Sequence, residues 1–300
     1  MTEHYDMILI GNVGRNEIHR FGGITEPILG GPICQCALAT TWSDRRVAVM
    51  TRMAEADADL LEPMNSAGID VYVSPTSETT RSHIYYLSED VEDRKHVLEK
   101  TAGPFSLADL PPIDARLFHL VGLNTLEFPL DFMADLRDRG TCFSVDMQAL
   151  VLVADPKTGE VSCLDYPHKQ EVAAMADKVK LDVTEAKLLT GSSDPERAAI
   201  QFERWGSSEV MVTGTEGALV RHEGKTYFEP FTNRNSSGRT GRGDTVFGSY
   251  LVRRMNFGVA ASLKSAVALT SIKMETPGPF VGTLDQVLDR MRTDLDQVIR

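Results

Sequence analysis

Short apolar runs alternate along the chain with longer amphipathic segments. The apolar runs include MILIG (7–11), RVAVMTRM (46–53), FHLVGL (118–123), CFSVDM (142–147) and EVMVTG (209–214). The longer segments include PICQCALATTW, ADLLEPMNSAG, LDFMADLRDRG and VFGSYLVRRM. Strand-length runs separated by helical patterns are typical of βαβ units and a parallel sheet. The pattern therefore predicts a three-layer αβα fold, in which a mostly parallel central sheet lies between two layers of helices.

One region departs from this rhythm. Residues 69–100 alternate β-branched and aromatic residues with polar ones, and no helical segment separates the runs. Such alternation predicts β-hairpins. Together with the short polar segment 15–28, these hairpins are expected to form a small sheet that serves as a lid over a site. Because no clean linker divides the chain, we expect residues 1–300 to form one domain, with the lid formed by about 15–28 and 69–100.

Charge and composition favour a small ligand. The 300 residues carry a formal net charge of -12 and contain no long run of Lys or Arg, which argues against nucleic acid or an anionic membrane as partner. The longest apolar stretches are far shorter than the roughly eighteen residues of a membrane span, and the N-terminal run is too short for a signal segment. The four cysteines are too sparse for a disulfide scaffold. We therefore expect a soluble protein of the reducing cytoplasm.

The most distinctive stretch is SSGRTGRGDTVFGSYLVRR (236–254), where glycines lead into a predicted helix. A helix N-terminus presents unpaired N–H groups and the positive end of the helix dipole, and Gly241 and Gly243 let the backbone approach an anion there. Asp244 lies at the same N-terminus, where a carboxylate can accept a proton from an incoming hydroxyl. An ordinary turn with Asp244 as helix N-cap fits the local spacing equally well. A Walker loop is excluded, because no Gly-Lys-Ser/Thr follows.

Three more motifs accompany GRTGRGD (238–244) along the chain. They are GGPICQCALA (30–39), DVTEAKLLTG (182–191) and VTGTEGALV (212–220). In this order the four motifs resemble those of the ribokinase-like, or PfkB, family of carbohydrate and nucleoside kinases, and the resemblance runs from end to end. It implies an enzyme that uses ATP and Mg²⁺ to phosphorylate a hydroxyl of a sugar, polyol or cyclitol.

The resemblance also implies roles in the glycine-rich stretch. Gly241, Arg242 and Gly243 are expected to form the anion hole for the transferring phosphate, and Asp244 is expected to contact the substrate hydroxyl as catalytic base. Gly238 stands where the family has an Asp, so a monovalent-cation ligand is lost. Arg242 replaces the family's Ala, and its guanidinium is expected to compensate by pairing with phosphate oxygens, unless it is a solvated surface residue.

Cofactor contacts are implied by two other motifs. Glu185 is expected to organise Mg²⁺ through water, with Asp182 nearby at the position that the family fills with Asn. The spacing of Asp182 and Glu185 also fits a capping box, which is a purely structural role. Thr213, Gly214 and Gly217 are expected to contact the nucleotide, although Gly217 also suits an ordinary hairpin turn.

The acceptor is expected to be held by Asn16, Gly31, Gln35 and Glu127. Asn16 replaces an Asp that grips sugar hydroxyls in many members, and Gln35 replaces a shorter Asn. An amide offers both donors and an acceptor, so the preferred hydroxyl pattern should differ from that of ribose, and a cyclitol or a nucleoside is expected instead. Asp146 ends a predicted strand, at the edge of a parallel sheet where ligands bind.

Other functions fit parts of the sequence. A nucleoside kinase of the same fold needs an apolar slot for the base, which Tyr72, Tyr85 and Tyr86 could line unless they pack between strands. A non-catalytic ligand-binding member is the second alternative, against which the intact Asp244 argues. A dehydrogenase is only weakly indicated by ILIGNVG (8–14), which lacks the third glycine of the dinucleotide motif. Both a monomer and a homodimer are compatible with the sequence.

Overall fold

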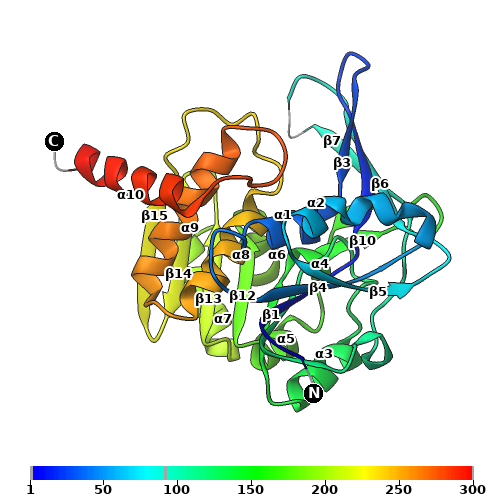
Figure 1. Ribbon diagram of the computed structural model, residues 1–300, viewed down its shortest axis with the longest axis horizontal. Coiled ribbons are helices and arrows are strands. Elements are labelled where there is room, and N and C mark those ends of the chain that lie inside the picture. Colours follow the sequence, from blue (N-terminus) through cyan, green and yellow to red (C-terminus); the bar gives the residue numbers. More distant parts are fainter. Residues whose placement is uncertain (1–2, 91–92, 299–300) are drawn as a thin grey trace.

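The computed structural model describes residues 3–90 and 93–298 (Figure 1). Its largest element is a nine-stranded sheet made of β1 (Glu3–Ile10), β4 (Val47–Met53), β5 (Asp70–Pro75), β8 (Ile113–Leu120), β9 (Cys142–Asp146), β12 (Lys178–Asp182), β13 (Glu209–Thr213), β14 (Gly217–His222) and β15 (Lys225–Pro230). Across the sheet the order is β15-β14-β13-β12-β9-β8-β1-β4-β5. β13, β14 and β15 pair antiparallel, and all other neighbours in this sheet pair in parallel.

Helices cover both faces of the large sheet (Figure 1). One layer consists of α1 (Gly31–Leu38), α2 (Glu62–Ser66), α8 (Arg242–Arg254) and α9 (Val259–Met274), with α10 (Leu284–Val298) packed on α9. The other layer consists of α3 (Leu130–Asp138), α5 (Lys169–Met175), α6 (Val183–Thr190) and α7 (Pro195–Trp205). Short elements connect these layers: 3₁₀ turns at Glu55–Leu61 and Leu107–Asp109, and α4 (Gln148–Val151).

The two hydrophobic cores follow from the two-residue period of the strands. On β13, Val210 and Val212 face one core while Met211 between them faces the other. Because both faces of such a strand are buried, its sequence is an apolar run without polar alternation. The expected αβα architecture with a mostly parallel sheet is confirmed. No helix within the described ranges is both long and apolar enough to span a bilayer.

A smaller four-stranded sheet projects from the large one (Figure 1). It has the order β3-β2-β6-β7 and consists of β2 (Gly14–His19), β3 (Thr25–Leu29), β6 (Thr80–Tyr86) and β7 (Arg94–Lys100). We call this sheet the lid. The hairpin of β10 (Leu152–Ala154) and β11 (Val161–Cys163) adjoins it, since the Leu98 N–H donates to the Gly159 carbonyl at 2.8 Å.

The predicted start of the lid segment 69–100 is too early in the chain. Residues 70–75 form β5, which pairs in parallel with β4 at the edge of the large sheet, so this part of the lid starts at Thr80. The alternation of apolar and polar residues is the same in a half-exposed edge strand and in a hairpin strand. The short α2 before β5 supplies the crossover that parallel pairing requires.

Candidate active site

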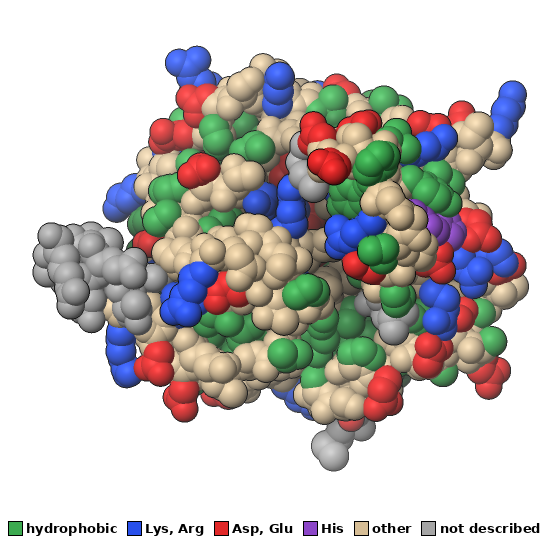
Figure 2. Space-filling view, turned by 90° about the horizontal axis from the view of Figure 1, so that it is seen from above, with side chains coloured by type: hydrophobic (Ala, Val, Ile, Leu, Met, Phe, Trp, Pro, Cys, Tyr) green, Lys and Arg blue, Asp and Glu red, His purple; other side chains and the backbone are tan. Residues whose placement is uncertain are grey.

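A cavity of about 480 Å³ lies between the lid and the carboxyl ends of the parallel strands. Ligands bind at this edge in open α/β sheets. The molecule seen from above is hollowed near its centre, with Lys and Arg side chains beside the hollow (Figure 2). The residues that line the cavity come from the lid, from α1, from the strand ends and from α8: Asn16, Ile28, Gly31, Pro32, Gln35, Ser82, Ile84, Arg94, His96, Leu123, Gln148, Leu152, Val161, Cys163, Asp182, Thr184, Glu185, Thr240, Gly241 and Asp244.

The N-terminus of α8 brings backbone N–H groups to this cavity. Gly241 is its N-cap, with φ of 81°, and a Cβ there would lie 2.7 Å from the Gln35 side chain. A Cβ on Gly243 would lie 2.8 Å from the ammonium of Lys180. Both glycines are therefore required by close approach, and Gly241 also by its left-handed backbone. This geometry is compatible with the anion-binding helix end that the sequence predicts, which stays a prediction.

Asp244 lies in the first turn of α8, almost fully buried. Its Oδ1 has no hydrogen-bond partner among the described residues. Burial and the nearby Asp146 together raise the pKa of its carboxyl to about 7, although Lys180 and Lys273 oppose the shift. Lys180 pairs with both oxygens of Asp146, at 2.9 and 3.1 Å. A carboxyl whose pKa is near neutrality suits a general base.

A second buried lysine supports the loop before α8. Lys273 of α9 is 3% exposed, and its ammonium donates to the carbonyl of Gly238 at 2.6 Å and to that of Thr240. Burial lowers the pKa of Lys273 to about 8, against the opposing field of Asp244. A Cβ on Gly238 would lie 1.9 Å from the Thr276 carbonyl oxygen, so this backbone excludes an Asp there.

Arg242 lies in the first turn of α8, and its expected pairing with phosphate oxygens stays a prediction. It is the first residue of α8, and its guanidinium carbon lies 5.7 Å from the ring centre of Phe231. It is not among the residues that line the cavity. A fixed positive charge against the loop before α8 comes from Lys273, a residue that sequence analysis missed. The only signal was a lysine within the apolar pattern of α9.

Asp182 and Glu185 form the capping box that their spacing permits. The Asp182 carboxylate accepts from the N–H groups of Thr184 and Glu185 at 2.7 Å each, and Glu185 accepts from the Asp182 N–H at 2.7 Å. Both carboxylates nevertheless line the cavity. Burial raises the pKa of Glu185, which Lys180 only partly offsets. Oxygen ligands at such a position fit Mg²⁺, and a bound cation would relieve the buried charge.

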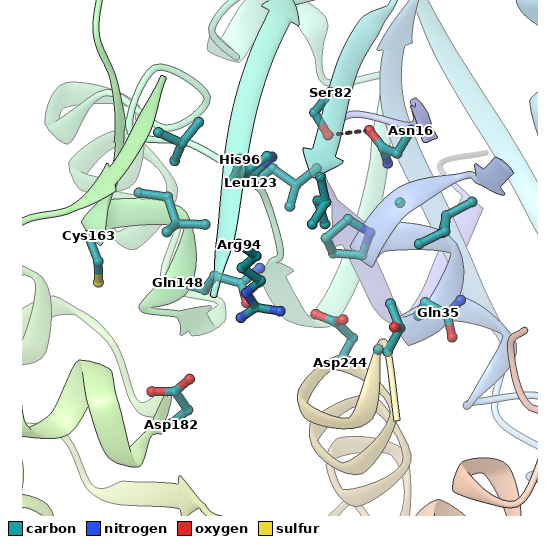
Figure 3. A pocket seen from close by; sticks show the side chains of 18 of the residues that line it. Asn16, Gln35, Ser82, Arg94, His96, Leu123, Gln148, Cys163, Asp182 and Asp244 are labelled. Carbon is teal, nitrogen blue, oxygen red and sulfur yellow. Dashed lines mark hydrogen bonds between the residues drawn. The ribbon is translucent and has the colours of Figure 1, made fainter. Parts of the chain in front are cut away.

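The far end of the cavity is built for hydroxyl groups (Figure 3). Ser82 of the lid donates its hydroxyl to Asn16 Oδ1 at 2.8 Å, which leaves the Asn16 amide nitrogen as donor to a ligand. A Cβ on Gly31 would lie 3.4 Å from that nitrogen. Gln35 Oε1 and His96 Nε2 are buried without a hydrogen-bond partner among the described residues. Burial lowers the pKa of His96 to about 4, so its imidazole is neutral.

The three expected nucleotide contacts do not line this cavity. Thr213 is fully buried, and its hydroxyl donates to the Leu181 carbonyl at 3.4 Å. The Gly214 N–H donates to the Gly217 carbonyl at 2.9 Å. Gly217 is pressed against β15, where a Cβ would lie 2.8 Å from the Phe228 ring. Their role toward a nucleotide stays a prediction.

Glu127 also lies outside the cavity lining. Its carboxylate accepts from the N–H groups of Asn12 and Leu123 at 3.2 and 2.8 Å, and from the Asn124 amide at 3.0 Å. Burial raises its pKa to about 7. Glu127 thus holds the loop after β8 through these hydrogen bonds, and its expected contact with the acceptor stays a prediction.

The tyrosines considered as a base-binding slot are elsewhere. Tyr72 of β5 hydrogen-bonds Tyr5 at 2.7 Å, Tyr85 stacks on His19 with ring centres 4.4 Å apart, and the guanidinium of Arg20 lies over Tyr86. The described residues that line the cavity include no Phe, Tyr or Trp.

Sequence analysis missed several lining residues, among them Ser82, Arg94, His96, Gln148 and Cys163. Arg94 reaches from β7 into the space between Asp182 and Asp244 (Figure 3). Arg94 and His96 lie two positions apart and therefore share one face of the strand. That spacing was the only signal, and it carries no motif.

The chain matches the sequence profile of the pfkB family carbohydrate kinases over residues 5–283. A 2-dehydro-3-deoxygalactonokinase of Haloferax volcanii is 23% identical over 240 residues, which are 75% of this chain and 74% of the relative. A sulfate complex of a pyrophosphate-dependent kinase in the ribokinase family superposes with a TM-score of 0.87, at 27% identity, over 94% of this chain and 99% of the other. Arabidopsis thaliana ribokinase with ribose and ATP shares the fold, with a TM-score of 0.75 at 16% identity over 97% and 99% of the two chains.

Proposed function

Because this chain belongs to the pfkB family of carbohydrate kinases, we propose that it phosphorylates a ring hydroxyl of a cyclitol or similar polyol. One observation carries the proposal. Asp244 Oδ1, Gln35 Oε1 and His96 Nε2 belong to residues that line one cavity, and all three are buried without a hydrogen-bond partner among the described residues. Buried polar atoms are nearly always paired in folded proteins, so an uncharged ligand with several hydroxyls is the partner that fits them.

The mechanism follows from the order of groups along the cavity. The acceptor hydroxyl gives its proton to the Asp244 carboxylate while its oxygen attacks the terminal phosphorus of the donor. The bond from that phosphorus to the leaving phosphate oxygen breaks, and the electron pair stays on the leaving group. N–H groups at the start of α8 stabilise the charge on the transferring group, with Lys273 and Lys180 holding the loop and the helix end in place. Mg²⁺, when bound near Asp182 and Glu185, would neutralise donor phosphate charge.

Two donors are considered. ATP is the donor expected from the sequence, and two solved ribokinases that share the fold carry ATP. Pyrophosphate is a second candidate, favoured because the pyrophosphate-dependent kinase is 26–27% identical to this chain whereas those ribokinases are 16–17% identical. It also fits the position of Thr213, Gly214 and Gly217 outside the cavity lining, since pyrophosphate needs no contact to a base or ribose.

A cyclitol acceptor is favoured by Asn16. With its oxygen bound to Ser82, the amide presents only N–H groups, whereas a carboxylate in this position would accept from two hydroxyls. A structure of the pyrophosphate-dependent kinase contains myo-inositol. We place myo-inositol first among acceptors, before ribose, fructose and nucleosides.

The test is a matrix of kcat/KM values for two donors and several acceptors with the wild-type protein and Mg²⁺. The acceptors are myo-inositol, other inositols, 2-dehydro-3-deoxygalactonate, ribose, fructose and nucleosides. We expect the highest value for an inositol. If kcat/KM is highest for ribose or for a nucleoside, the acceptor proposal is contradicted. The kcat/KM values with ATP and with pyrophosphate separately decide between the two donors.

A further inference from the structure

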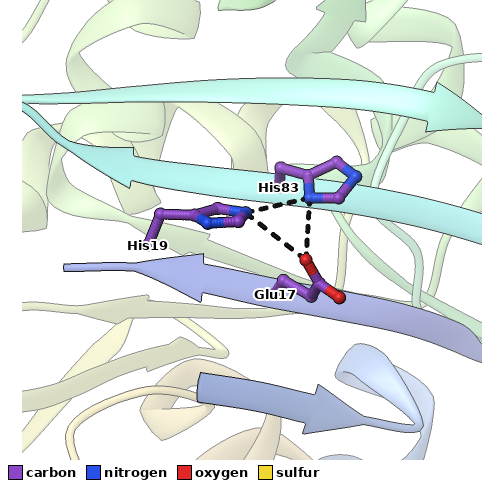
Figure 4. Close-up of side chains that lie close together, drawn as sticks. All are labelled: Glu17, His19 and His83. Carbon is purple, nitrogen blue, oxygen red and sulfur yellow. Dashed lines mark hydrogen bonds and ion pairs between the residues drawn. The ribbon is translucent and has the colours of Figure 1, made fainter. Parts of the chain in front are cut away.

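Two histidines and a glutamate meet on the lid, away from the cavity. Asn16 and Ser82 line the cavity, so their strand neighbours Glu17 and His83 point to the opposite face of the lid. In the parallel pairing of β2 with β6, Glu17 lies directly beside His83. His19 is two positions after Glu17 and shares its face. The three side chains converge there (Figure 4).

The three inward atoms have the spacing of metal ligands. His19 Nε2 lies 3.1 Å from His83 Nδ1, and Glu17 Oε2 lies 3.4 Å from each of these nitrogens. Nitrogen and oxygen ligands at about 2.0–2.1 Å from a tetrahedral Zn²⁺ are separated from one another by about 3.3 Å. The side chains are 27%, 16% and 42% exposed for His19, His83 and Glu17, so an ion and a water ligand can enter.

The outer nitrogens of both rings are held by partners that turn the lone pairs inward. His83 Nε2 lies 3.0 Å from Glu99 Oε2, and a carboxylate can only accept, so this nitrogen carries the proton and Nδ1 is bare. His19 Nδ1 lies 3.1 Å from Thr25 Oγ1, where it can donate in the same way. The bond from His83 holds the pKa of Glu99 below its usual range. Ligating histidines in metal sites are typically oriented by such outer hydrogen bonds.

When His19 Nδ1 donates to Thr25, both inward nitrogens present lone pairs, and these two nitrogens and the Glu17 oxygen repel one another unless a positive charge lies between them. We propose that Glu17, His19 and His83 bind a divalent transition-metal ion such as Zn²⁺, with water as the fourth ligand. Mixed nitrogen and oxygen ligands favour such an ion over Mg²⁺, which prefers oxygen. The site joins β2 to β6 and so clamps the two central strands of the lid. It is independent of the proposed kinase activity.

The test uses the full chain, stripped of metal with a chelator and titrated with Co²⁺ and then Zn²⁺. Wild type is expected to bind one Co²⁺ with the intense visible spectrum of a four-coordinate ion, which Zn²⁺ displaces. His83→Ala and Glu17→Gln should abolish or strongly weaken this binding. Glu99→Gln should weaken it by about 10- to 100-fold, the usual effect of losing an outer-shell partner. His168→Ala is the matched control, because His168 is a half-exposed histidine outside the cluster whose Nδ1 lies 2.8 Å from Glu171 Oε1.

Melting temperatures measured with chelator show whether each variant folds. Glu17→Gln keeps the shape of the side chain, so it still tests the proposal if His83→Ala does not fold. Zn²⁺ should raise the melting temperature of wild type and of His168→Ala but not of the site variants. Equal Co²⁺ affinity in wild type and Glu17→Gln overturns the proposal. A Co²⁺ spectrum typical of six-coordination, or the absence of stoichiometric Co²⁺ binding, also overturns it. The cluster would then be one in which the two histidines share a proton.

Discussion

Asp244 and Lys273 give the proposed reaction a bell-shaped pH dependence. Asp244 must be deprotonated to accept the hydroxyl proton, and its pKa is raised to about 7, so kcat/KM should rise as the pH increases through that value. Lys273 must be protonated to hold its two carbonyls, and its pKa is lowered to about 8, so kcat/KM should fall above that value. The measurement is a pH profile from about pH 5 to about pH 9. A flat profile would show that neither group titrates in the free enzyme as described.

We predict that Lys273 also makes the site independent of potassium. Its ammonium holds the carbonyls of Gly238 and Thr240, where a bound cation would otherwise be needed to offset their charge. Wild-type activity should therefore respond little to K⁺. Lys273→Ala should lower kcat by about 10²-fold, the order seen when one fixed electrostatic group is lost, and K⁺ should restore part of it.

Arg242→Ala is the matched comparison for that experiment, because the Arg242 guanidinium carbon lies 5.7 Å from the ring centre of Phe231, whereas Lys273 donates to the two carbonyls. It should leave the K⁺ response unchanged. Strong K⁺ activation of the wild type would contradict this prediction. So would a K⁺ response in Arg242→Ala that is absent from Lys273→Ala, because Arg242 and not Lys273 would then replace the cation.

We predict that Asn16 sets the choice of acceptor. Its oxygen is occupied by Ser82, so Asn16→Asp replaces N–H donors by a second acceptor in the cavity. A hydrogen bond to the ligand contributes about 0.5–1.5 kcal/mol. Its loss should lower kcat/KM for inositol by about 2- to 10-fold. The ratio of ribose to inositol should rise. The measurement is the acceptor panel repeated with Asn16→Asp; an unchanged ranking would remove Asn16 from the specificity determinants.

The site residues that could be predicted from the sequence are those that belong to recognisable motifs. Gly241, Gly243 and Asp244 could be assigned because close backbone approach and a helix N-terminus impose particular residue types in a fixed spacing. Ser82 and His96 could not, because a polar residue on one face of a strand looks the same whether it faces a ligand or solvent. Nor did the sequence indicate that Glu127 holds the loop after β8, since a carboxylate that accepts from loop N–H groups and one that binds a ligand look the same in sequence.

The elements that position the site differ in how well their sequences define them. The buried parallel strands were evident from apolar runs, since both of their faces are covered. β5 was assigned to the lid because an edge strand and a hairpin strand share the same two-residue alternation. The contact of Lys273 with the loop before α8 depends on how α9 packs against that loop, which no local pattern encodes.

The N-terminus of α8 offers a test of the anion hole. Gly241→Ala forces a Cβ onto a backbone with φ of 81° and to within 2.7 Å of Gln35, so the loop must shift. We expect kcat to fall by about 10²-fold or more, because N–H groups that stabilise a transition state depend on their position. Gly258→Ala is the control, since a Cβ there meets nothing within 4 Å. If kcat and the melting temperature change equally in both variants, the anion hole is not at Gly241.

In the whole molecule, the cavity exists only because two sheets meet. The lid contributes Asn16, Ser82, Arg94 and His96, and the large sheet with its helices contributes Asp182, Glu185 and Asp244. In the proposed function the acceptor binds between groups from the two sheets, and the donor phosphates bind at the helix ends. The βαβ rhythm predicted the large sheet, and the motifs predicted the family. The depth of the cavity, and its buried polar atoms without a hydrogen-bond partner, could be seen only in the assembled fold.

The central claim is phosphoryl transfer to an inositol hydroxyl with Asp244 as base. The most direct measurement is the turnover of wild type and of Asp244→Asn with myo-inositol and each donor, together with the affinity of each protein for myo-inositol. The claim predicts an inositol phosphate as product, a loss of about 10²- to 10⁴-fold in kcat for Asp244→Asn, and nearly unchanged myo-inositol affinity. Absence of product with the wild type, or near wild-type turnover of Asp244→Asn, contradicts it.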